Sequence, residues 1–366
     1  MTLKIDPAQL RHLRLRAQGL AAPVNDLRQL LTGAVSLQAQ DYNAAVLGVR
    51  ARSCGLVDED VREALIDGDL CWTWLMRGTL HLVTMADLPW LLPLFGPQFI
   101  RLTARRYREL GLDEEARGRA TSLLRQILAD GPQTRAALKD KLAAEGLPVE
   151  GQACPHLLRH AALEGALVCV PLRNSRPEYR LLDDRAMDGW PGSDEAAARL
   201  SRRFLRAFGP ANAADLARWS GLPMQLARAG LNALADEVTA IKAAGQEVVI
   251  PNGQLPWLDD EPRRSLFLLP AFDALLLSHV DRDLVLPPEV SRAIHPGGGI
   301  IRPSLLIDGV VRGRWQLKRG RRSLTVIVTP FVPVPRGRLP QLEAEVEDIG
   351  RFLGRAAVMK LEEVAA

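Results

Sequence analysis

Residues 116–171 have the sequence ARGRATSLLRQILADGPQTRAALKDKLAAEGLPVEGQACPHLLRHAALEGALVCVP. The first part predicts an amphipathic helix, because apolar residues return at intervals of three and four positions and therefore share one face. That face consists of Ala116, Ala120, Leu123, Leu124, Ile127 and Leu128. The helical pattern breaks at residues 130–132, Asp-Gly-Pro, and Thr134 is suited to cap a second helix over residues 136–144.

The same stretch ends in a third helix and a strand. Pro155 fits the first turn of this helix, and Gly165 is suited to end it. Its apolar face consists of Leu157, Leu158, Ala161 and Ala162. Residues 166–171 have the composition of a strand. Three helices followed by a hairpin is the order of a winged helix, a module that binds DNA.

The pattern recurs on both sides of this stretch. After it, a break at Gly209-Pro210 precedes Asn212, which is suited to cap another helix. Before it, residues 57–66 and residues 70–84 match the third helix and the hairpin of a more divergent copy. The repeat predicts three tandem winged-helix modules, which we place at residues 1–110, 111–190 and 191–260.

From residue 261 to residue 366 the pattern changes to short β-rich runs with turn signals, among them Asp308-Gly309. Residues 342–358 predict a closing helix. The Gly-rich residues 296–299 predict a plain turn, since they lack the preceding strand and following helix that a nucleotide-binding loop needs. The expected fold class is therefore α+β, with three tandem winged-helix modules and a C-terminal β-rich domain.

Composition gives only a weak indication of the partner. The 366 residues include 47 basic and 43 acidic side chains, so the formal net charge is +4, and the pI is near 9.0. Only six of the basic residues are lysines, and an arginine-rich surface suits a polyanion. No apolar run is long enough to span a bilayer, and no signal-peptide core follows the start. We expect a cytoplasmic, nucleoid-associated protein without a membrane partner.

The metal-binding residue types are scattered. The four cysteines form no CxxC pair, which predicts buried thiols rather than a zinc site or disulfides. They are Cys54, Cys71, Cys154 and Cys169. His156 and His160 have the i, i+4 spacing of metal ligands, but no third ligand is near, so we expect them on a helix surface or facing a groove. No metal and no cofactor are expected.

Two glutamines are the candidate catalytic residues. Gln38 and Gln40 lie between predicted helices over residues 27–35 and 42–49, where neutral polar side chains are not needed for solubility. They share a face only if the backbone is extended, because side chains at i and i+2 diverge by about 200° on a helix. Alternatively, Asp41 caps the following helix and both glutamines are solvated loop residues.

Three sequence blocks carry a family resemblance. They are residues 37–41 (LQAQD), residues 74–83 (WLMRGTLHLV), and residues 269–273 (LPAFD) with Asp281-Arg282. Together they resemble the AlkZ family of bacterial winged-helix DNA glycosylases, over about residues 10 to 330. The resemblance implies three winged helices and a β domain around a DNA channel.

The resemblance also implies a catalytic role for Gln38 and Gln40, which match the Gln-x-Gln element of the AlkZ family. A sister branch, similar to the YcaQ proteins, has an acidic residue at the second position. Gln40 therefore places this chain nearer to the AlkZ branch.

Glutamines suit one particular substrate chemistry. A purine alkylated at N7 carries a positive charge that weakens its glycosidic bond, so the leaving base needs little general acid. Two glutamine side chains on one face can hold a water against the anomeric carbon. No lysine lies in a motif that suggests an amine nucleophile. We therefore expect a monofunctional glycosylase that acts as a monomer on double-stranded DNA with N7-alkylated purines, including bulky adducts or interstrand crosslinks.

Other candidate residues have two interpretations each. Arg77, Thr79 and His81 alternate on one predicted strand face and could meet a phosphate, although a solvated face of a wing strand explains them equally well. His279 and Asp281 could join a catalytic floor or form a hydrogen-bonded turn with a local ion pair.

Residues 318–322 (KRGRR) predict a basic hairpin tip. Arg319, Arg321 and Arg322 could enter a minor groove, or they could form a charged turn at the edge of a sheet.

A different class of function remains as the alternative. Winged helices are mostly binding modules, and a fold does not prescribe a reaction. The sequence is therefore also compatible with a non-catalytic DNA-binding regulator, or with a self-resistance protein that masks lesions.

Overall fold

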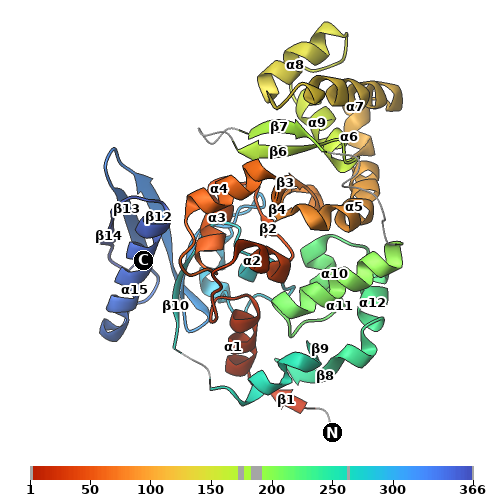
Figure 1. Ribbon diagram of the computed structural model, residues 1–366. Coiled ribbons are helices and arrows are strands. Elements are labelled where there is room, and N and C mark those ends of the chain that lie inside the picture. The colour runs from red at the N-terminus through yellow and green to blue at the C-terminus, as the bar shows by residue number, and fades with distance from the viewer. Residues whose placement is uncertain (1–2, 172–176, 183–191, 262–263, 365–366) are drawn as a thin grey trace. The chain divides into compact units, whose positions relative to one another are not determined.

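The computed structural model describes residues 3–171, 177–182, 192–261 and 264–364. Their mixture of helices and sheets confirms the α+β fold class (Figure 1). Contacts divide the chain into two compact units, which we describe separately. The middle unit is Arg62–Ala197, and the split unit combines Met1–Val61 with Ala198–Ala366. The division into three winged-helix modules stays a prediction, and its boundary at residue 190 lies outside the described residues.

The middle unit contains the elements predicted from residues 116–171, in the predicted order. They are α7 (Glu114–Ala129), α8 (Arg135–Ala144), α9 (Ala153–Leu163), β6 (Leu167–Pro171) and β7 (Pro177–Leu181). Thr134 caps α8, because its side chain accepts a 3.2 Å hydrogen bond from the amide of Ala137. Gly165 follows α9 with a φ of +72°, a left-handed conformation that glycine adopts without strain.

A second hairpin joins this set in one sheet of order β4-β3-β6-β7-β5. The further elements are α4 (Asp58–Asp67), β3 (Leu70–Trp74), η1 (Met76–Gly78), β4 (Leu80–Thr84), α5 (Leu88–Leu102), α6 (Ala104–Glu109) and β5 (Gln133–Thr134). Trp72 pairs with Cys169 where the two hairpins meet. Gly96 lets α5 approach α9, since a Cβ at Gly96 would lie 2.4 Å from the carbonyl oxygen of Leu163.

The split unit brings the start of the chain together with its second half. The N-terminal elements are β1 (Leu3–Ile5), α1 (Pro7–Ala17), α2 (Leu27–Ala34), β2 (Leu37–Gln38) and α3 (Tyr42–Arg50). Those of the second half begin with α10 (Ser193–Phe208), α11 (Ala213–Ser220), α12 (Met224–Asn232), β8 (Val238–Ala243), β9 (Gln246–Pro251) and η5 (Asn252–Asp259). β1 pairs in parallel with β8, which completes a sheet of order β1-β8-β9.

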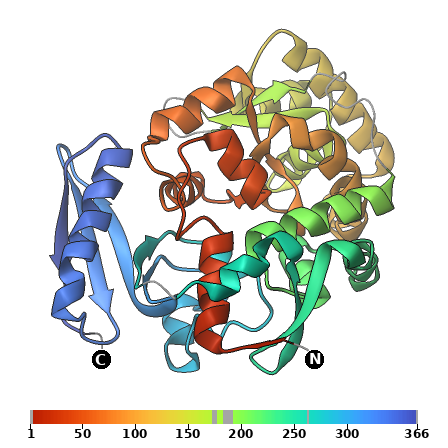
Figure 2. The same ribbon diagram turned by 60° about the horizontal axis from the view of Figure 1, so that its bottom comes forward.

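A second sheet of the split unit has the order β10-β11-β12-β13-β14, with α15 packed on it (Figure 2). The elements are β10 (Leu266–Leu269), α13 (Ala274–Leu277), α14 (Ser291–Ile294), β11 (Ser304–Ile307), β12 (Val310–Arg319), β13 (Leu324–Pro330), α15 (Leu339–Phe352) and β14 (Ala357–Leu361). The strand runs and the turn at Asp308-Gly309 are confirmed. The Gly-rich residues form a turn closed by the bridge between Gly297 and Ile300.

The predicted closing helix over residues 342–358 is wrong at its C-terminal end. α15 ends at Phe352, and β14 then pairs in parallel with β13. Gly354 has a φ of +63°, a left-handed conformation in which the chain can turn after the helix. Gly350 allows the chain to pass close to α15, because a Cβ at Gly350 would lie 2.7 Å from the carbonyl oxygen of Arg355. The helical prediction missed this glycine signal because the apolar residues beyond it continue at a spacing that also fits a helix.

A buried ion pair ties the two parts of the split unit together. Arg52, 2% exposed, donates 2.8 Å hydrogen bonds from two guanidinium nitrogens to both carboxylate oxygens of Asp273, 3% exposed. Around this pair, Leu15 and Leu20 from the N-terminal part share an apolar core with Leu269 and its neighbours. The pair therefore fixes residues 270–273 relative to the end of α3.

We expect Asp273→Asn to lower the free energy of unfolding by about 3–5 kcal/mol, because it leaves the Arg52 guanidinium buried without a counter-charge. Urea unfolding followed by circular dichroism measures this change. Glu237→Gln is the control, since it breaks the partly exposed pair with Arg202 and should cost far less. A similar loss in both variants would contradict this role for the buried pair.

Candidate active site and nucleic-acid interface

The two glutamines lie on an extended segment between α2 and α3. Burial alternates along this segment: Leu37 and Ala39 are 3% and 0% exposed, whereas Gln38 is half-buried and Gln40 is exposed. The strand β2 itself covers only Leu37–Gln38, and Gln40 lies in a bend, so it is the alternating burial that distinguishes the two accessible glutamines from their buried neighbours. Whether the two glutamines act as a pair stays a prediction.

The alternative interpretation of this segment is that Asp41 caps the following helix and that both glutamines are solvated loop residues. Asp41 does cap α3, accepting a 3.1 Å hydrogen bond from the amide of Ala44. Gln38, however, is not a plain loop residue, because it lines a small cleft with residues 270–273. Two of the three resembling sequence blocks therefore meet here.

Asp273 is the acidic residue of this cleft, but it has a positioning role. Both of its oxygens are bound to Arg52, and one of them also accepts a 2.9 Å hydrogen bond from the amide of Leu275 at the start of α13. These three hydrogen bonds hold the carboxylate in one orientation. Gln38 and Gln40 thus remain the candidates for water positioning.

The block at residues 74–83 is a hairpin in the middle unit. Arg77 lies in η1, with a φ of +53°, before β4 begins. The hydroxyl of Thr79 donates a 3.2 Å hydrogen bond to the carbonyl oxygen of Met76, and His81 is 2% exposed. The prediction that Arg77, Thr79 and His81 share a strand face is therefore wrong, because the turn interrupts the alternation. Their contact with DNA stays a prediction.

His81 is held neutral inside β4. Its Nδ1 donates a 2.9 Å hydrogen bond to the carbonyl oxygen of Thr79. Burial, with a smaller contribution from Arg77, lowers the pKa of His81 to about 3. His81 therefore carries no charge at neutral pH.

His279 has a comparable environment in the split unit. Its Nε2 donates to the carbonyl oxygen of Phe208 at 3.0 Å, and its Nδ1 lies 2.9 Å from the hydroxyl of Ser278. Burial lowers the pKa of His279 well below its usual value. Asp281 is exposed and accepts a 3.0 Å hydrogen bond from the amide of Asp283. The geometry favours a hydrogen-bonded turn over a catalytic floor.

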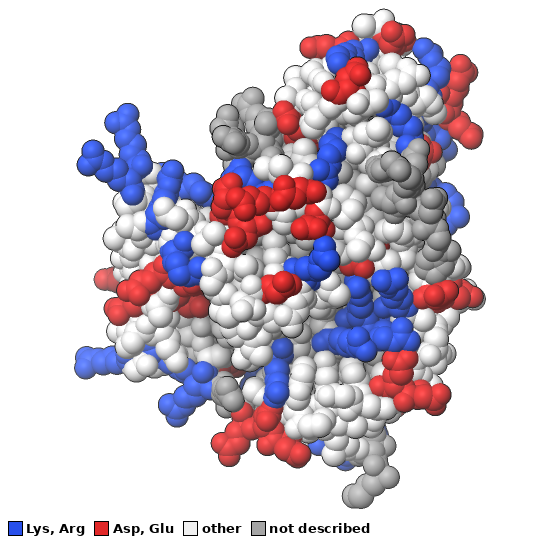
Figure 3. All heavy atoms as spheres, viewed as in Figure 1, with Lys and Arg blue, Asp and Glu red and all other residues white. Residues whose placement is uncertain are grey.

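The basic hairpin tip joins β12 to β13. Lys318, Arg319, Arg321 and Arg322 are exposed, and Figure 3 shows blue spheres projecting from this end of the sheet. Arg319 donates a 3.3 Å hydrogen bond to the side-chain oxygen of Asn43 at the start of α3. The hairpin therefore contacts the first turn of α3, and Asn43 is three residues beyond Gln40 in the chain.

Arg159 on α9 is a further basic residue that no sequence motif marks. This half-buried arginine lies against the η1 turn, where a Cβ on Gly78 would come within 2.3 Å of its Nη2. Among the described residues, no carboxylate pairs with Arg159 and its buried Nε has no acceptor. Burial lowers the pKa of Arg159. A guanidinium held without a counter-charge is suited to a phosphate.

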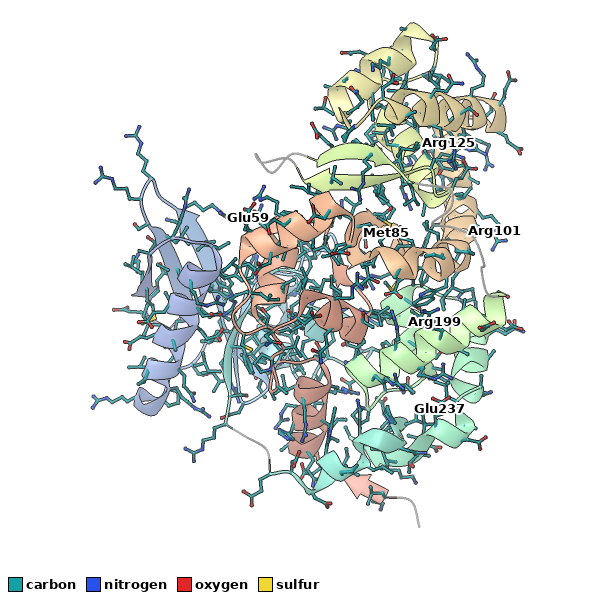
Figure 4. The ribbon with its side chains drawn as sticks, in the orientation of Figure 1. Glu59, Met85, Arg101, Arg125, Arg199 and Glu237 are labelled. Carbon is teal, nitrogen blue, oxygen red and sulfur yellow. The ribbon has the colours of Figure 1, made fainter. Side chains whose placement is uncertain are left out.

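A second missed feature is an arginine stripe on α10. Its members are Arg199, Arg202, Arg203 and Arg206, whose spacing puts them on one helix face. Figure 3 shows blue spheres gathered over α10, and Figure 4 labels Arg199 together with Glu237, the partner of Arg202. The spacing of these arginines in the sequence is the signal that could have identified them.

The burial of the four cysteines and of the two histidines on α9 agrees only partly with the sequence predictions. Cys71, Cys154 and Cys169 are buried as predicted, but the prediction is wrong for Cys54, which is exposed in the segment after α3. His160 is 4% exposed rather than on the surface, because its ring packs edge-on against Tyr107 at 5.5 Å. Within the described part of the chain, no group of three or more suitable side chains could hold a metal.

Comparison with known proteins now identifies the family. A family model described as DNA glycosylase AlkZ-like matches residues 31–352. This chain belongs to the AlkZ-like DNA glycosylase family. The interstrand DNA cross-link repair glycosylase of Streptomyces sahachiroi is 28% identical over 331 residues, covering 87% of this chain and 88% of that protein. The structure of Streptomyces sahachiroi DNA glycosylase AlkZ matches with a TM-score of 0.84 at 25% identity, over 98% of this chain and 100% of that chain.

Membership of the AlkZ-like family confirms both the resemblance noted in the sequence and the expected enzyme class, a DNA N-glycosylase. No helix in the described residues of this family member is long and apolar enough to cross a membrane. The roles of single residues in the site stay predictions.

Acid should destabilise this AlkZ-like chain. The unfolded state takes up a proton at His81 and His279 below about pH 6.5, whereas the folded state leaves both neutral, so stability falls as the pH drops below that value. We expect His81→Asn to reduce the pH dependence of the unfolding free energy between pH 6.5 and 4, measured by urea titration. A His81→Asn profile parallel to wild type would contradict this.

Replacing Arg319, Arg321 and Arg322 with alanine should weaken DNA binding and flatten its salt dependence. Each lost phosphate contact removes about 0.9 from the slope of log affinity against log salt. Fluorescence anisotropy with a duplex at several salt concentrations measures this slope. An unchanged slope would show that the hairpin does not touch DNA.

Proposed function

We propose that this protein is a monofunctional DNA glycosylase that hydrolyses the N-glycosidic bond of N7-alkylated purines in double-stranded DNA. The observation that carries the proposal is that Gln38 is half-buried and Gln40 is exposed, while their neighbours Leu37 and Ala39 are buried. Gln38 also lines the cleft formed with residues 270–273. We infer that the two amides hold the attacking water there.

The proposed reaction depends on where the two glutamine amides hold the water, and less on a strong general acid. A glutamine carbonyl accepts a hydrogen bond from water, while its amide donates to sugar, phosphate or base. Two such groups can hold the water against the anomeric carbon, and their carbonyl dipoles stabilise the positive charge that develops on the sugar. Neutral side chains also avoid placing a carboxylate against the phosphates.

The lysines support excision without strand cleavage. A lysine nucleophile needs a desolvated environment that lowers its pKa, and none of the six lysines is buried. All of them are exposed or half-exposed side chains, so none has the surroundings of a Schiff-base lysine. We therefore propose that water, and not an amine, attacks the sugar.

The fold supports a finer proposal for how DNA is bound. Three sets of three helices, each followed by two strands, occur in chain order: α2 to β4, α7 to β7, and α10 to β9. We propose that these are three winged-helix modules and that the protein works as a monomer. A Streptomyces sahachiroi relative is named an interstrand cross-link repair glycosylase, which supports crosslinks or bulky adducts as further substrates.

We expect Gln38→Ala and Gln40→Ala to lower the single-turnover excision rate far more than DNA affinity. Losing one preorganised polar contact costs about 2.7–4 kcal/mol in the transition state, or roughly 100- to 1000-fold in rate. The assay uses a duplex with N7-methylguanine and cleaves the abasic product with alkali. Gln40→Asp should retain more activity than Gln40→Ala, because a carboxylate can also position water.

Gln126→Ala, at an exposed position on α7, is the matched control and should excise at the wild-type rate. Equal excision by wild type and by the folded Gln38→Ala, Gln40→Ala double variant would remove these residues from the mechanism. Binding without any strand breaks in the wild type would instead favour a non-catalytic, lesion-masking protein.

A further inference from the structure

A cavity that the proposed reaction does not use lies within the split unit, between α1, α2 and η5. Its volume is about 400 Å³. Figure 2 shows α1 in red with the teal η5 helix beside it, and Arg16 on α1 stacks over the ring of Trp257 on η5 at 4.5 Å. The remaining wall is formed largely by small and aliphatic residues, including Ala17, Leu30 and Ala34. The cavity is large enough for a heterocycle of purine size.

Gly33 in the last turn of α2 lines this cavity without a packing reason to be glycine. A Cβ at Gly33 would meet nothing within 4 Å, and its backbone is not in the left-handed region. Glycine in a helix costs about 1 kcal/mol relative to alanine. Its absent side chain leaves the space beside α2 open.

Gln18, 5% exposed, supplies a fixed amide in the cavity wall. Its Oε1 accepts a 3.1 Å hydrogen bond from Arg52, which is itself held by Asp273. This bond determines which way the amide faces, and it leaves Nε2 as a buried donor with no acceptor among the residues that the structure describes. An unmatched buried donor favours a ligand that brings a carbonyl or ring-nitrogen acceptor.

The charges of the wall favour a neutral ligand. Arg52 is neutralised by Asp273, and Arg16 pairs with Asp260. The cavity therefore has no cation left over for a phosphate, unlike the environment of Arg159. A flat, uncharged molecule with an acceptor edge matches both the shape and the charge.

We propose that this cavity binds a neutral purine base, namely the base that excision releases. The proposal rests on the proposed function for the origin of the ligand. N7-alkylated guanine is cationic while bonded to the sugar, and it becomes neutral when the electron pair of the broken glycosidic bond returns to the ring. The neutral wall therefore accepts the released base and not the cationic nucleotide.

Isothermal titration calorimetry with 7-methylguanine as the free base, in the absence of DNA, tests the proposal. Wild type should bind the base, and Gly33→Leu should abolish binding by filling the open space. Gln18→Glu keeps the acceptor for Arg52 but loses the donor, and should weaken binding about three- to tenfold. Gly118→Leu is the matched control, because Gly118 is also an exposed helical glycine whose Cβ would meet nothing within 4 Å.

The outcomes separate this inference from the proposed function. Absence of binding to wild type, equal binding by folded Gly33→Leu, or tighter binding of inorganic phosphate overturns the cavity assignment even if excision is active. Binding that Gly33→Leu removes and Gly118→Leu retains supports the cavity, whether or not the protein excises bases.

Discussion

The candidate site depends on the buried ion pair between Arg52 and Asp273. Both charges are buried, so each needs the other, and their pairing holds together two segments that lie 221 residues apart in the chain. Arg50 adds a parallel tie, with a 2.6 Å hydrogen bond to the carbonyl oxygen of Leu268 and an ion pair with Glu345. These two arginines place residues 270–273 against Gln38.

The proposed role of the glutamines requires that their segment be held in place. Asp41 fixes the start of α3 on one side of the segment, and Val35, with a φ of +65°, ends α2 on the other. Leu37 and Ala39 are buried between these points, so the backbone has little freedom. An amide has no full charge to stabilise a transition state, and its contribution therefore depends on such fixed placement.

The modest net charge conceals strongly local basic surfaces. The hairpin tip after β12, the stripe on α10 and the half-buried guanidinium of Arg159 each concentrate positive charge, while acidic residues elsewhere reduce the total to +4. Phosphates respond to the local field, because charges beyond about 10 Å are screened at ordinary salt concentrations. Net charge was consequently a poor guide to the partner.

The sequence alone determined what depends on neighbouring residues: the helices and hairpin of residues 116–171, the caps at Thr134 and Asp41, the strands from β10 to β13, and the family through its three blocks. It did not determine that β14 follows α15, that Arg77 leaves the strand, or that His160 is buried. Nor could it show Gln38 beside residues 270–273, or the cavity at Gly33. Periodicity and capping act over a few residues, whereas burial and ion pairing are decided by segments that only folding brings together.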